Sequence, residues 1–410
     1  MSASSNPVWI TGIGLLSCLG EGVEAHWNGL NDGAVSVDTE RFAPYPVHAL
    51  GEVDWASQIS RRDMRQMEGW QRIGTYAAGL ALDDAGAKGD EDLCGRMDMI
   101  VAAGGGERDA EVDGTIMAQA RASEIEKSRN AGTNNHDALL NERLANDLRP
   151  TLFLAQLSNL LAGNISIVHK VTGSSRTFMG EEGAGISALK TAHARIASGQ
   201  SDIVLVGGGF NGEREDMLLL FELGHFLTRG DHAPVWSRPD EQAGFAQGSI
   251  GAFLILESAE HAKAREAKPY AALANVDADA GSRTGSKMTD RLSGMKQAIG
   301  ANEPDAIFSA ATGVSQPTSA EQEWLAAHYP GTPIRAIGTK LGHGVEAQFP
   351  LAIALAAMAV AKGDLFTGAE EAETAATNPI QSALATGIGH LRAEGLGLVT
   401  RADTNQVRSS

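Results

Sequence analysis

Short apolar, β-branched runs alternate along the chain with longer stretches whose apolar residues recur every three to four positions. The short runs, bounded by Gly and polar residues, predict buried strands, and the longer stretches predict amphipathic helices. The predicted strands are 8–14, 97–105, 165–170, 202–209, 251–258, 305–313, 334–340 and 396–401; the predicted helices include 69–85, 183–199, 258–267, 318–328 and 345–362. This alternation indicates an α/β fold with mostly parallel sheets and helices on their faces.

Two segments half a chain apart resemble each other. "DMIVAAGGG" (98–106) and "DAIFSAATG" (305–313) each begin with Asp, continue as an apolar run and end in small residues. The resemblance predicts two related halves, 1–250 and 251–410. The segment 107–150 is polar and charged at both ends, which predicts a helical insertion on the first half.

The chain has 410 residues and a net charge of −18, from 33 Lys and Arg against 51 Asp and Glu. So acidic a surface repels nucleic acid and anionic membranes, so neither is an expected partner. Cys18 and Cys94 share no short spacing and form neither a disulfide framework nor a metal motif. The most apolar long run, 151–170, is interrupted by polar residues, so it predicts a buried helix and strand instead of a membrane span. No secretory signal is recognisable at the N-terminus, so we expect a cytoplasmic protein. The last residues, "DTNQVRSS" (403–410), are expected to form a frayed tail.

Two glycine-rich motifs invite a nucleotide interpretation. "TGIGLLS" (11–17) follows a predicted strand and resembles a dinucleotide-binding turn, but its third Gly is missing, so a tight turn is favoured over a nicotinamide site. "GGGFNG" (207–212) lacks the Lys-Ser/Thr of a phosphate-binding loop. It is better explained as a strand exit packed closely on neighbouring backbone. No cofactor is expected.

"GHGVE" (342–346) places His343 and Glu346 three residues apart, a spacing that an acid–base or metal pair on a helix could use. No third ligand is close in sequence, so no metal is expected. A histidine satisfied within a turn or core is the alternative.

The stretch "SRRDMRQMEGWQR" (60–72) is basic in an otherwise acidic chain. Its arginines could form an ordinary solvated helix face. They could also form a local docking patch for an acidic partner, for which Arg62 and Arg65 are the candidates.

Glu181 and Glu182 lie where a loop turns into the predicted helix 183–199. A carboxylate in the first turn of a helix is ordinarily structural, because the helix dipole and free N–H groups stabilise it. The flanking Gly180, Gly183 and Gly185 instead imply a strained turn with close backbone approach, like the turn that presents a nucleophile.

Over nearly its whole length the sequence resembles the β-ketoacyl–acyl carrier protein synthase family. The resemblance rests on "VWITGIGLLSCLGEGVEAHWNGLNDG" (8–33), residues 60–86, "NLLAGNISIVHKVTGSS" (159–175), "GQSDIVLVGGG" (199–209) and "GSIGAFLILESAEHAKAREAKPYA" (248–271). It implies a thiolase-like fold, in which two related βα halves are packed as α/β/α/β/α layers. It also implies acyl carrier protein as a partner and a dimer, expected to form through the strand 202–208.

The family uses a Cys nucleophile at a helix N-terminus and two histidines, and the matching positions here differ. Without gaps from Asn159 through Gly173, the nucleophile position falls on Glu182. Thr312 replaces the first histidine in "TGVSQP", whereas "GTKLGHGVEAQFP" keeps Lys340 and His343 at a spacing shortened by two. The oxyanion and gating loop is reduced to "TGIGHLRAEG", which places Gly387, Ile388 and Gly389 at its centre.

These departures imply altered chemistry, since an ionised carboxylate is a weak nucleophile and an acyl-Glu would be a labile anhydride. We expect a non-condensing subunit, similar to the family's chain-length factors, that forms a homodimer or a heterodimer with a catalytically complete synthase in fatty acid biosynthesis. A link to the very-long-chain acyl groups of lipid A is a further resemblance. The alternatives are a malonyl-carrier decarboxylase or priming subunit, an atypical active synthase, and the nicotinamide enzyme built on 11–17.

Overall fold

The computed structural model describes residues 6–33, 35–129, 136–147, 156–285 and 287–403. Its large sheet contains two groups of five strands each. The first group runs in the order β1 (Val8–Ser17), β8 (Ile250–Ser258), β6 (Ile203–Phe210), β4 (Asp98–Ala103) and β5 (Ser175–Met179). The first two pairs of neighbours are antiparallel and the last two are parallel. β5 therefore forms an outer edge of the sheet.

The second group repeats this pattern. Its order is β9 (Ala271–Asp279), β13 (Glu394–Thr400), β12 (Ser382–Ile388), β10 (Ala306–Ser309) and β11 (Ile334–Ala336). Again two antiparallel pairs are followed by two parallel pairs. β4 and β10 occupy equivalent places, as the resemblance between their sequences predicted. β1 and β9 pair with each other in antiparallel orientation, and this pairing joins the two groups.

The division of the chain at 250/251 stays a prediction, and strand pairing favours a later point. β8 begins at that boundary but pairs with β1 and β6 of the first group. The chain reaches the second group only after α11 (Ala259–Ala264), which precedes β9.

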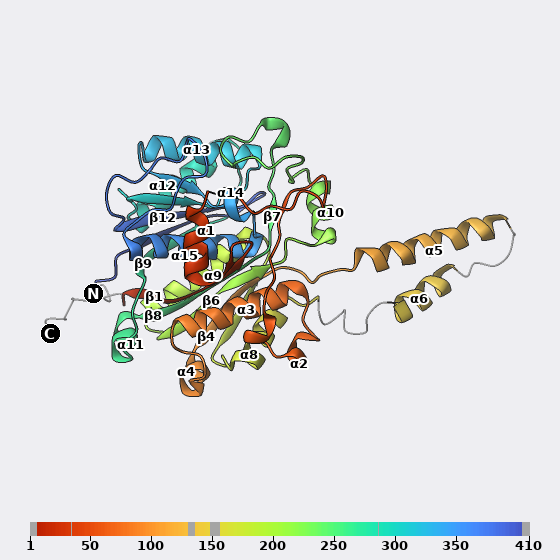
Figure 1. Ribbon diagram of the computed structural model, residues 1–410, viewed down its shortest axis with the longest axis horizontal. Coiled ribbons are helices and arrows are strands. Elements are labelled where there is room, and N and C mark those ends of the chain that lie inside the picture. The colour runs from red at the N-terminus through yellow and green to blue at the C-terminus, as the bar shows by residue number, and fades with distance from the viewer. Residues whose placement is uncertain (1–5, 34, 130–135, 148–155, 286, 404–410) are drawn as a thin grey trace.

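Helices and sheet groups alternate in five layers, as the family resemblance implied (Figure 1). One outer layer contains α3 (Gly69–Asp84) and α8 (Leu160–His169), which pack on the first group. The other contains α12 (Lys287–Ile299) and α13 (Ser315–His328), which pack on the second group. Between the two groups lie α9 (Glu182–Ala197) and α15 (Gln348–Lys362).

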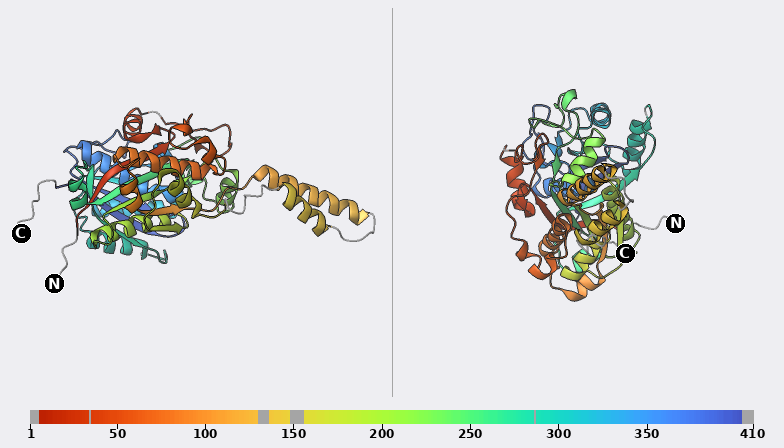
Figure 2. Two further views of the ribbon diagram at one scale, coloured as in Figure 1. Left: turned by 90° about the horizontal axis from the view of Figure 1, so that it is seen from below. Right: turned by 90° about the vertical axis from the view of Figure 1, so that its right-hand side faces the viewer.

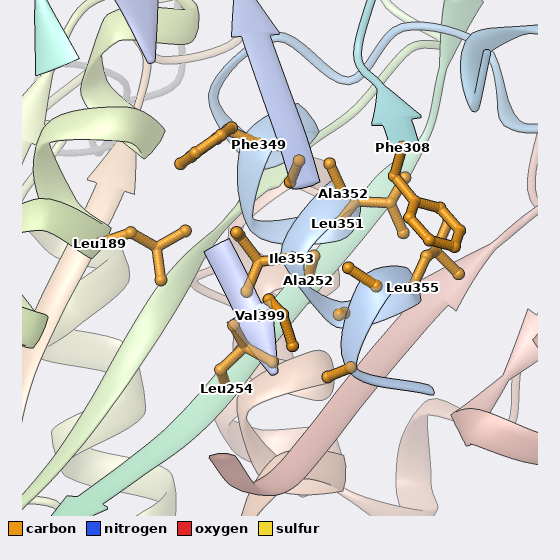
Figure 3. Packing of buried hydrophobic residues seen from close by; sticks show 14 of the residues in the cluster. Leu189, Ala252, Leu254, Phe308, Phe349, Leu351, Ala352, Ile353, Leu355 and Val399 are labelled. Carbon is orange, nitrogen blue, oxygen red and sulfur yellow. The ribbon is translucent and has the colours of Figure 1, made fainter. Parts of the chain in front are cut away.

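The central position of α15 explains its composition. Val345–Lys362 is apolar and long enough to cross a membrane, but 89% of it is buried in the protein. Figure 3 shows Phe349, Leu351, Ile353 and neighbouring apolar residues of α15 packed among side chains of both groups. A helix enclosed on all sides is expected to be apolar all round, so this stretch is a core helix.

The glycines of 11–17 serve helix packing, which corrects both interpretations of that motif. Residues 8–17 form β1 without a turn. A Cβ at Gly14 would lie 2.0 Å from the carbonyl oxygen of Ala77, and one at Gly12 would lie 2.6 Å from that of Ala81. The glycines therefore let α3 approach the strand. The glycines of 207–209 likewise meet neighbouring backbone, as predicted.

The predicted strand 165–170 is wrong, since these residues belong to α8 and the turn after it. β-branched residues in "ISIVHK" favoured a strand. The buried residues of α8 are Leu161, Ala162, Ile165 and His169, a helical spacing, and Lys170 ends the helix with φ +62°. Tertiary burial of one helical face thus overrides the local preference.

The predicted insertion at 107–150 forms α5 (Ala110–Arg129) and α6 (His136–Asp147), which project from the body as a hairpin (Figures 1 and 2). β5, β9 and β12 were not predicted as strands. Of the predicted tail, residues 404–410 lie outside the described residues.

Candidate functional site

Glu182 is the first residue of α9 and follows β5 through a tight turn. Gly180 in this turn has φ +123°, a conformation that favours Gly. A Cβ at Gly185 would lie 2.3 Å from the carbonyl oxygen of Glu346, so the helix start also makes the close backbone approach expected from its glycines. The Glu182 side chain is buried at the interior end of this turn.

Two imidazoles and one backbone N–H converge on the Glu182 carboxylate. His343 Nε2 donates to Oε1 at 2.7 Å, and His390 Nδ1 donates to Oε1 at 2.9 Å and lies 3.2 Å from Oε2. The backbone N–H of His390 donates to Oε1 at 3.2 Å. Both histidines are buried. Oε1 therefore receives three hydrogen bonds from groups of this chain, whereas Oε2 shares only the His390 ring nitrogen.

Burial alone would raise the pKa of Glu182. The hydrogen bonds from His343 and His390 and the proximity of the two rings outweigh burial, and hold the pKa well below its ordinary value. The start of α9 favours the same ionised form, because its backbone N–H groups are positive at that end. Glu182 is thus a carboxylate at neutral pH.

His390 is the site residue that the sequence analysis did not single out. It follows Gly389 directly, and its ring contacts three aromatic rings, those of Phe221, Phe226 and Phe245. The signal was present in the sequence, since a histidine lies in the loop that the family resemblance brings to the nucleophile position. Only the fold shows that its ring faces Glu182.

Gly387 and Ile388 end β12, and Gly389 begins the loop that carries His390. A Cβ at Gly389 would lie 3.0 Å from Glu182 Oε2, so the loop passes directly over the carboxylate. The Gly389 N–H donates to Ala393 O at 2.9 Å. The N–H that points into the site is instead that of His390.

His343 and Glu346 do not share a helical face. His343 pairs with the backbone of Gln247, and Glu346 lies in a short 3₁₀ turn, Val345–Ala347, before α15. Glu346 is buried, and its Oε2 has no hydrogen-bonding partner among the residues that the structure describes. Burial raises the pKa of Glu346 to about 8, and the neighbouring Glu182 charge adds to that rise.

The structure places Lys340 and Thr312 away from these contacts. Lys340 Nζ donates to the carbonyl oxygen of Leu30. The Thr312 hydroxyl accepts from the Val314 N–H at 3.1 Å, a local turn at the start of α13. Within the described residues neither side chain hydrogen-bonds to Glu182, His343 or His390.

Arg62 lies in α2 (Arg61–Met64) and Arg65 follows it, and both are exposed. Ser60 accepts from the Asp63 N–H and caps this short helix. Both guanidinium groups lie on the surface and, among the residues that the structure describes, neither forms an ion pair with a residue of the site. This placement suits either of the two explanations given for the basic stretch.

A cavity of about 450 Å³ adjoins the start of α9. Its lining combines the edge strand, the helix start and the His390 loop, and includes Met179, Glu181, Ile186 and Arg392. Arg392 is paired with Glu181 at 3.3 Å across its rim. Within the described ranges, no cluster of three or more His, Cys, Asp or Glu side chains has the geometry of a metal site.

Comparison with known proteins shows the family of this chain. Residues 5–262 match the family described as "Beta-ketoacyl synthase, N-terminal domain". The 3-oxoacyl-[acyl-carrier-protein] synthase 2 of Vibrio harveyi is 27% identical over 279 residues, which are 66% of this chain and 62% of that protein. The tetracenomycin polyketide synthase ketoacyl synthase beta subunit of Streptomyces glaucescens is 27% identical over 377 residues, 88% of this chain and 87% of that subunit.

Solved structures give the same fold. The ishigamide ketosynthase/chain length factor superposes with a TM-score of 0.78 at 19% identity, and covers 97% of this chain and 100% of that one. A ketosynthase structure described as a type II PKS acyl-carrier protein in complex with its ketosynthase has a TM-score of 0.72 at 18% identity. From its thiolase-like layers and the family match over more than half of its length, this chain belongs to the beta-ketoacyl synthase family.

Proposed function

We propose that this chain is a non-condensing subunit of a β-ketoacyl synthase pair, which works with a catalytically complete synthase and influences acyl chain length. The observation that carries the proposal is the buried Glu182 carboxylate at the start of α9, which is hydrogen-bonded by two imidazoles and a backbone N–H. A condensing enzyme needs a nucleophile there that can attack a thioester. Here that position holds an ionised carboxylate bound by His343 and His390.

The surrounding groups support the same conclusion. The inward-pointing N–H of the loop, that of His390, donates to Glu182 and not to an incoming acyl oxygen. An oxyanion donor acts only when it points at the position of the developing charge. Thr312 has no imidazole with which to move a proton. We therefore assign no thioester-storing step to this chain alone.

The partner would be a related synthase, joined through the edge strand β5. The dimer strand expected from the sequence, 202–208, corresponds to β6, which is hydrogen-bonded on both sides, to β4 and β8. β5 lies at the edge, and its Met179 is 74% exposed. A free strand edge can add a strand from another chain. Homodimer and heterodimer both remain within the proposal.

The names of the relatives fit this role. One is called a ketosynthase beta subunit and another a ketosynthase/chain length factor. We further propose that this chain acts in the cytoplasm, in fatty acid assembly on acyl carrier protein. The more specific proposal is a link to the very-long-chain acyl groups of lipid A. Docking of the acidic carrier at Arg62 and Arg65 belongs to the proposed function as well.

Co-purification with candidate synthases tests the role in chain length. The complex, the synthase alone, and the complex with this chain carrying Glu182→Ala are supplied with acyl- and malonyl-carrier, and products are resolved by mass. A shift in product length that requires this chain supports the proposal. Identical product lengths with and without a stably bound subunit contradict it.

Malonyl-carrier decarboxylation is a second candidate, favoured by the convergence of His343 and His390. To stabilise the enolate left after loss of CO₂, the two imidazoles would have to release Glu182 and donate to the substrate instead. Protonated Glu346, whose Oε2 is unpartnered, could supply the proton for its carbon. Acetyl-carrier formation by the purified chain, and its loss in His343→Ala, tests this activity. A rate equal to that in buffer rules it out.

A further inference from the structure

A buried carboxylate lies beside the loop that carries His390. Glu394, the first residue of β13, is fully buried and is bound by two arginines. Arg283 Nε donates to Oε1 at 2.8 Å, and Arg291 Nη2 donates to Oε2 at 2.6 Å. Arg283 lies between β9 and α12, and Arg291 lies on α12. Both oxygens of Glu394 are therefore bound by cations from a separate part of the second half.

Arg283 also binds the loop itself. Its Nη1 donates to His390 O and its Nη2 donates to Ala393 O, each at 3.3 Å. Ala393 has φ +70°, a conformation that a residue with a side chain seldom adopts. Such a conformation persists only when its surroundings hold it in place. Arg283 provides that support at both ends of the loop.

Arg291 fixes the segment from which Arg283 reaches. Its Nη1 donates to Ser282 O at 2.7 Å and to Lys287 O at 3.1 Å. The side chains of Arg283 and Arg291 are only 10% and 14% exposed. The cluster of Arg283, Arg291 and Glu394 is thus a rigid support made from β13, α12 and the segment before α12.

Between the His390 and Ala393 carbonyls, the tip of the loop is exposed. Leu391 is 51% exposed, and the Arg392 side chain is 69% exposed. His390 reaches Glu182 through its ring and also through its backbone N–H, so both contacts depend on where the loop backbone lies.

We propose that Arg283 is a positioning residue that, through Glu394 and the two loop carbonyls, holds His390 against Glu182 and keeps that carboxylate occupied. The biological meaning of an occupied carboxylate rests on the proposed function. The positioning itself does not, because it involves no carrier and no partner.

The test is the ionisation of Glu182, followed by ¹³C NMR of its carboxyl in glutamate-labelled protein and assigned with Glu182→Gln. Arg283→Gln removes the support, so one donor to Glu182 is lost and the pKa of Glu182 rises by about one unit or more. Arg283→Lys keeps the charge but loses the fork that bridges two carbonyls, and gives a smaller rise. The other ionisable groups around Glu182, namely His343, Glu346 and Glu181, are the same in every variant.

Arg265→Gln is the matched control. Arg265 also binds a fully buried carboxylate, that of Glu257, but in the β8 and α11 region away from the site. It should leave the Glu182 titration unchanged. Should Arg283→Gln not fold, the near-isosteric Glu394→Gln, which removes the charge that holds Arg283, is judged by the same rise.

An unchanged Glu182 titration in folded Arg283→Gln or Glu394→Gln, or an equal rise in Arg265→Gln, overturns the positioning role. That result leaves the proposed function standing. Condensation by the purified chain has the reverse effect, since it removes the proposed function and leaves the NMR result intact.

Discussion

Glu182 and Glu346 are buried carboxyl groups of one site whose pKa values move in opposite directions. Glu182 receives three hydrogen bonds and is ionised, whereas Glu346 Oε2 has none within the described part of the chain and burial favours its neutral form. The lowered pKa of Glu182 stabilises the folded protein at any pH above the ordinary pKa of a Glu side chain. This stability is lost as the pH falls through the lowered pKa that Glu182 has in the folded protein. The raised pKa of Glu346 has the opposite effect, because it stabilises the folded protein at low pH and this stability is lost as the pH rises.

Glu346→Gln tests this difference. The stability linked to neutral Glu346 is full below its ordinary pKa of 4.5 and is lost as the pH rises through about 8. The free energy of unfolding of the variant should therefore gain on wild type across that range, by roughly 1.4 kcal/mol per unit of pKa shift. Urea denaturation at several pH values measures it. Glu323→Gln, at an exposed position of α13, is the control, and a parallel pair of curves for Glu346→Gln and wild type would contradict the assignment.

Glu182→Ala should destabilise the protein, because it leaves the His343 and His390 donors buried without an acceptor. Removing one partner of a buried charged network costs about 3–5 kcal/mol. Glu182→Gln keeps one acceptor oxygen and should cost less. Chemical denaturation measures both, with Glu323→Ala, at an exposed position of α13, as the control. A cost for Glu182→Ala no larger than that of the control would mean that the network is not formed.

Sequence reasoning identified Glu182 and His343 because a family resemblance gave their positions. It did not identify His390, and it placed Glu346 on one helical face with His343, because both roles depend on loops brought together from distant parts of the chain. It grouped Lys340 with them, although the Lys340 side chain binds Leu30 O. Residue types and spacing show which groups are available, but not which way a side chain points.

At the scale of elements, long buried strands and amphipathic helices were predictable and short or polar strands were not. β1, β4, β6 and β8 are fully buried and show as apolar runs. β5 is exposed at three of its five residues, so its sequence, "SRTFM", has no apolar run to detect. Part of α8 was predicted as a strand, because its β-branched residues obscure the helical spacing of its buried residues.

The packing of α3 on β1 gives an element-scale prediction. In Gly14→Ala the added methyl would meet the Ala77 carbonyl oxygen and backbone of Ala81, so the helix must shift. Overpacking of this kind costs about 1–3 kcal/mol. Gly294→Ala, in α12 with open space around it, should instead stabilise by up to about 1 kcal/mol. Thermal unfolding measures both, and equal changes of the same sign would contradict this explanation of the motif.

At the scale of the molecule, the two repeated halves bring the site together. α9 follows β5, and the turn with His343 and α15 follows β11, which holds the equivalent place in the second group. The helix start with Glu182 and the turn with His343 therefore meet between the two groups. The sequence predicted the halves from one resemblance between strands, but not this meeting point, which depends on the order of strands in space.

Carrier docking is tested by reversing charge on the surface. The double variant Arg62→Glu and Arg65→Glu should weaken carrier binding by the complex. This chain and the carrier are both acidic, so a local basic patch must supply the attraction between them. The effect should shrink at high salt. Arg96→Glu with Lys268→Glu, also exposed, is the control with the same change in charge. Carrier affinity that is equal in both double variants would place docking on the partner subunit.

The most direct test of the central claim is intact-protein mass spectrometry of the purified chain after incubation with acyl- and malonyl-carrier. Because Glu182 is an occupied carboxylate in place of a nucleophile, we expect no acyl adduct on the chain and no β-ketoacyl product above the buffer control. A stable acyl adduct together with β-ketoacyl-carrier formed by this chain alone would contradict the account.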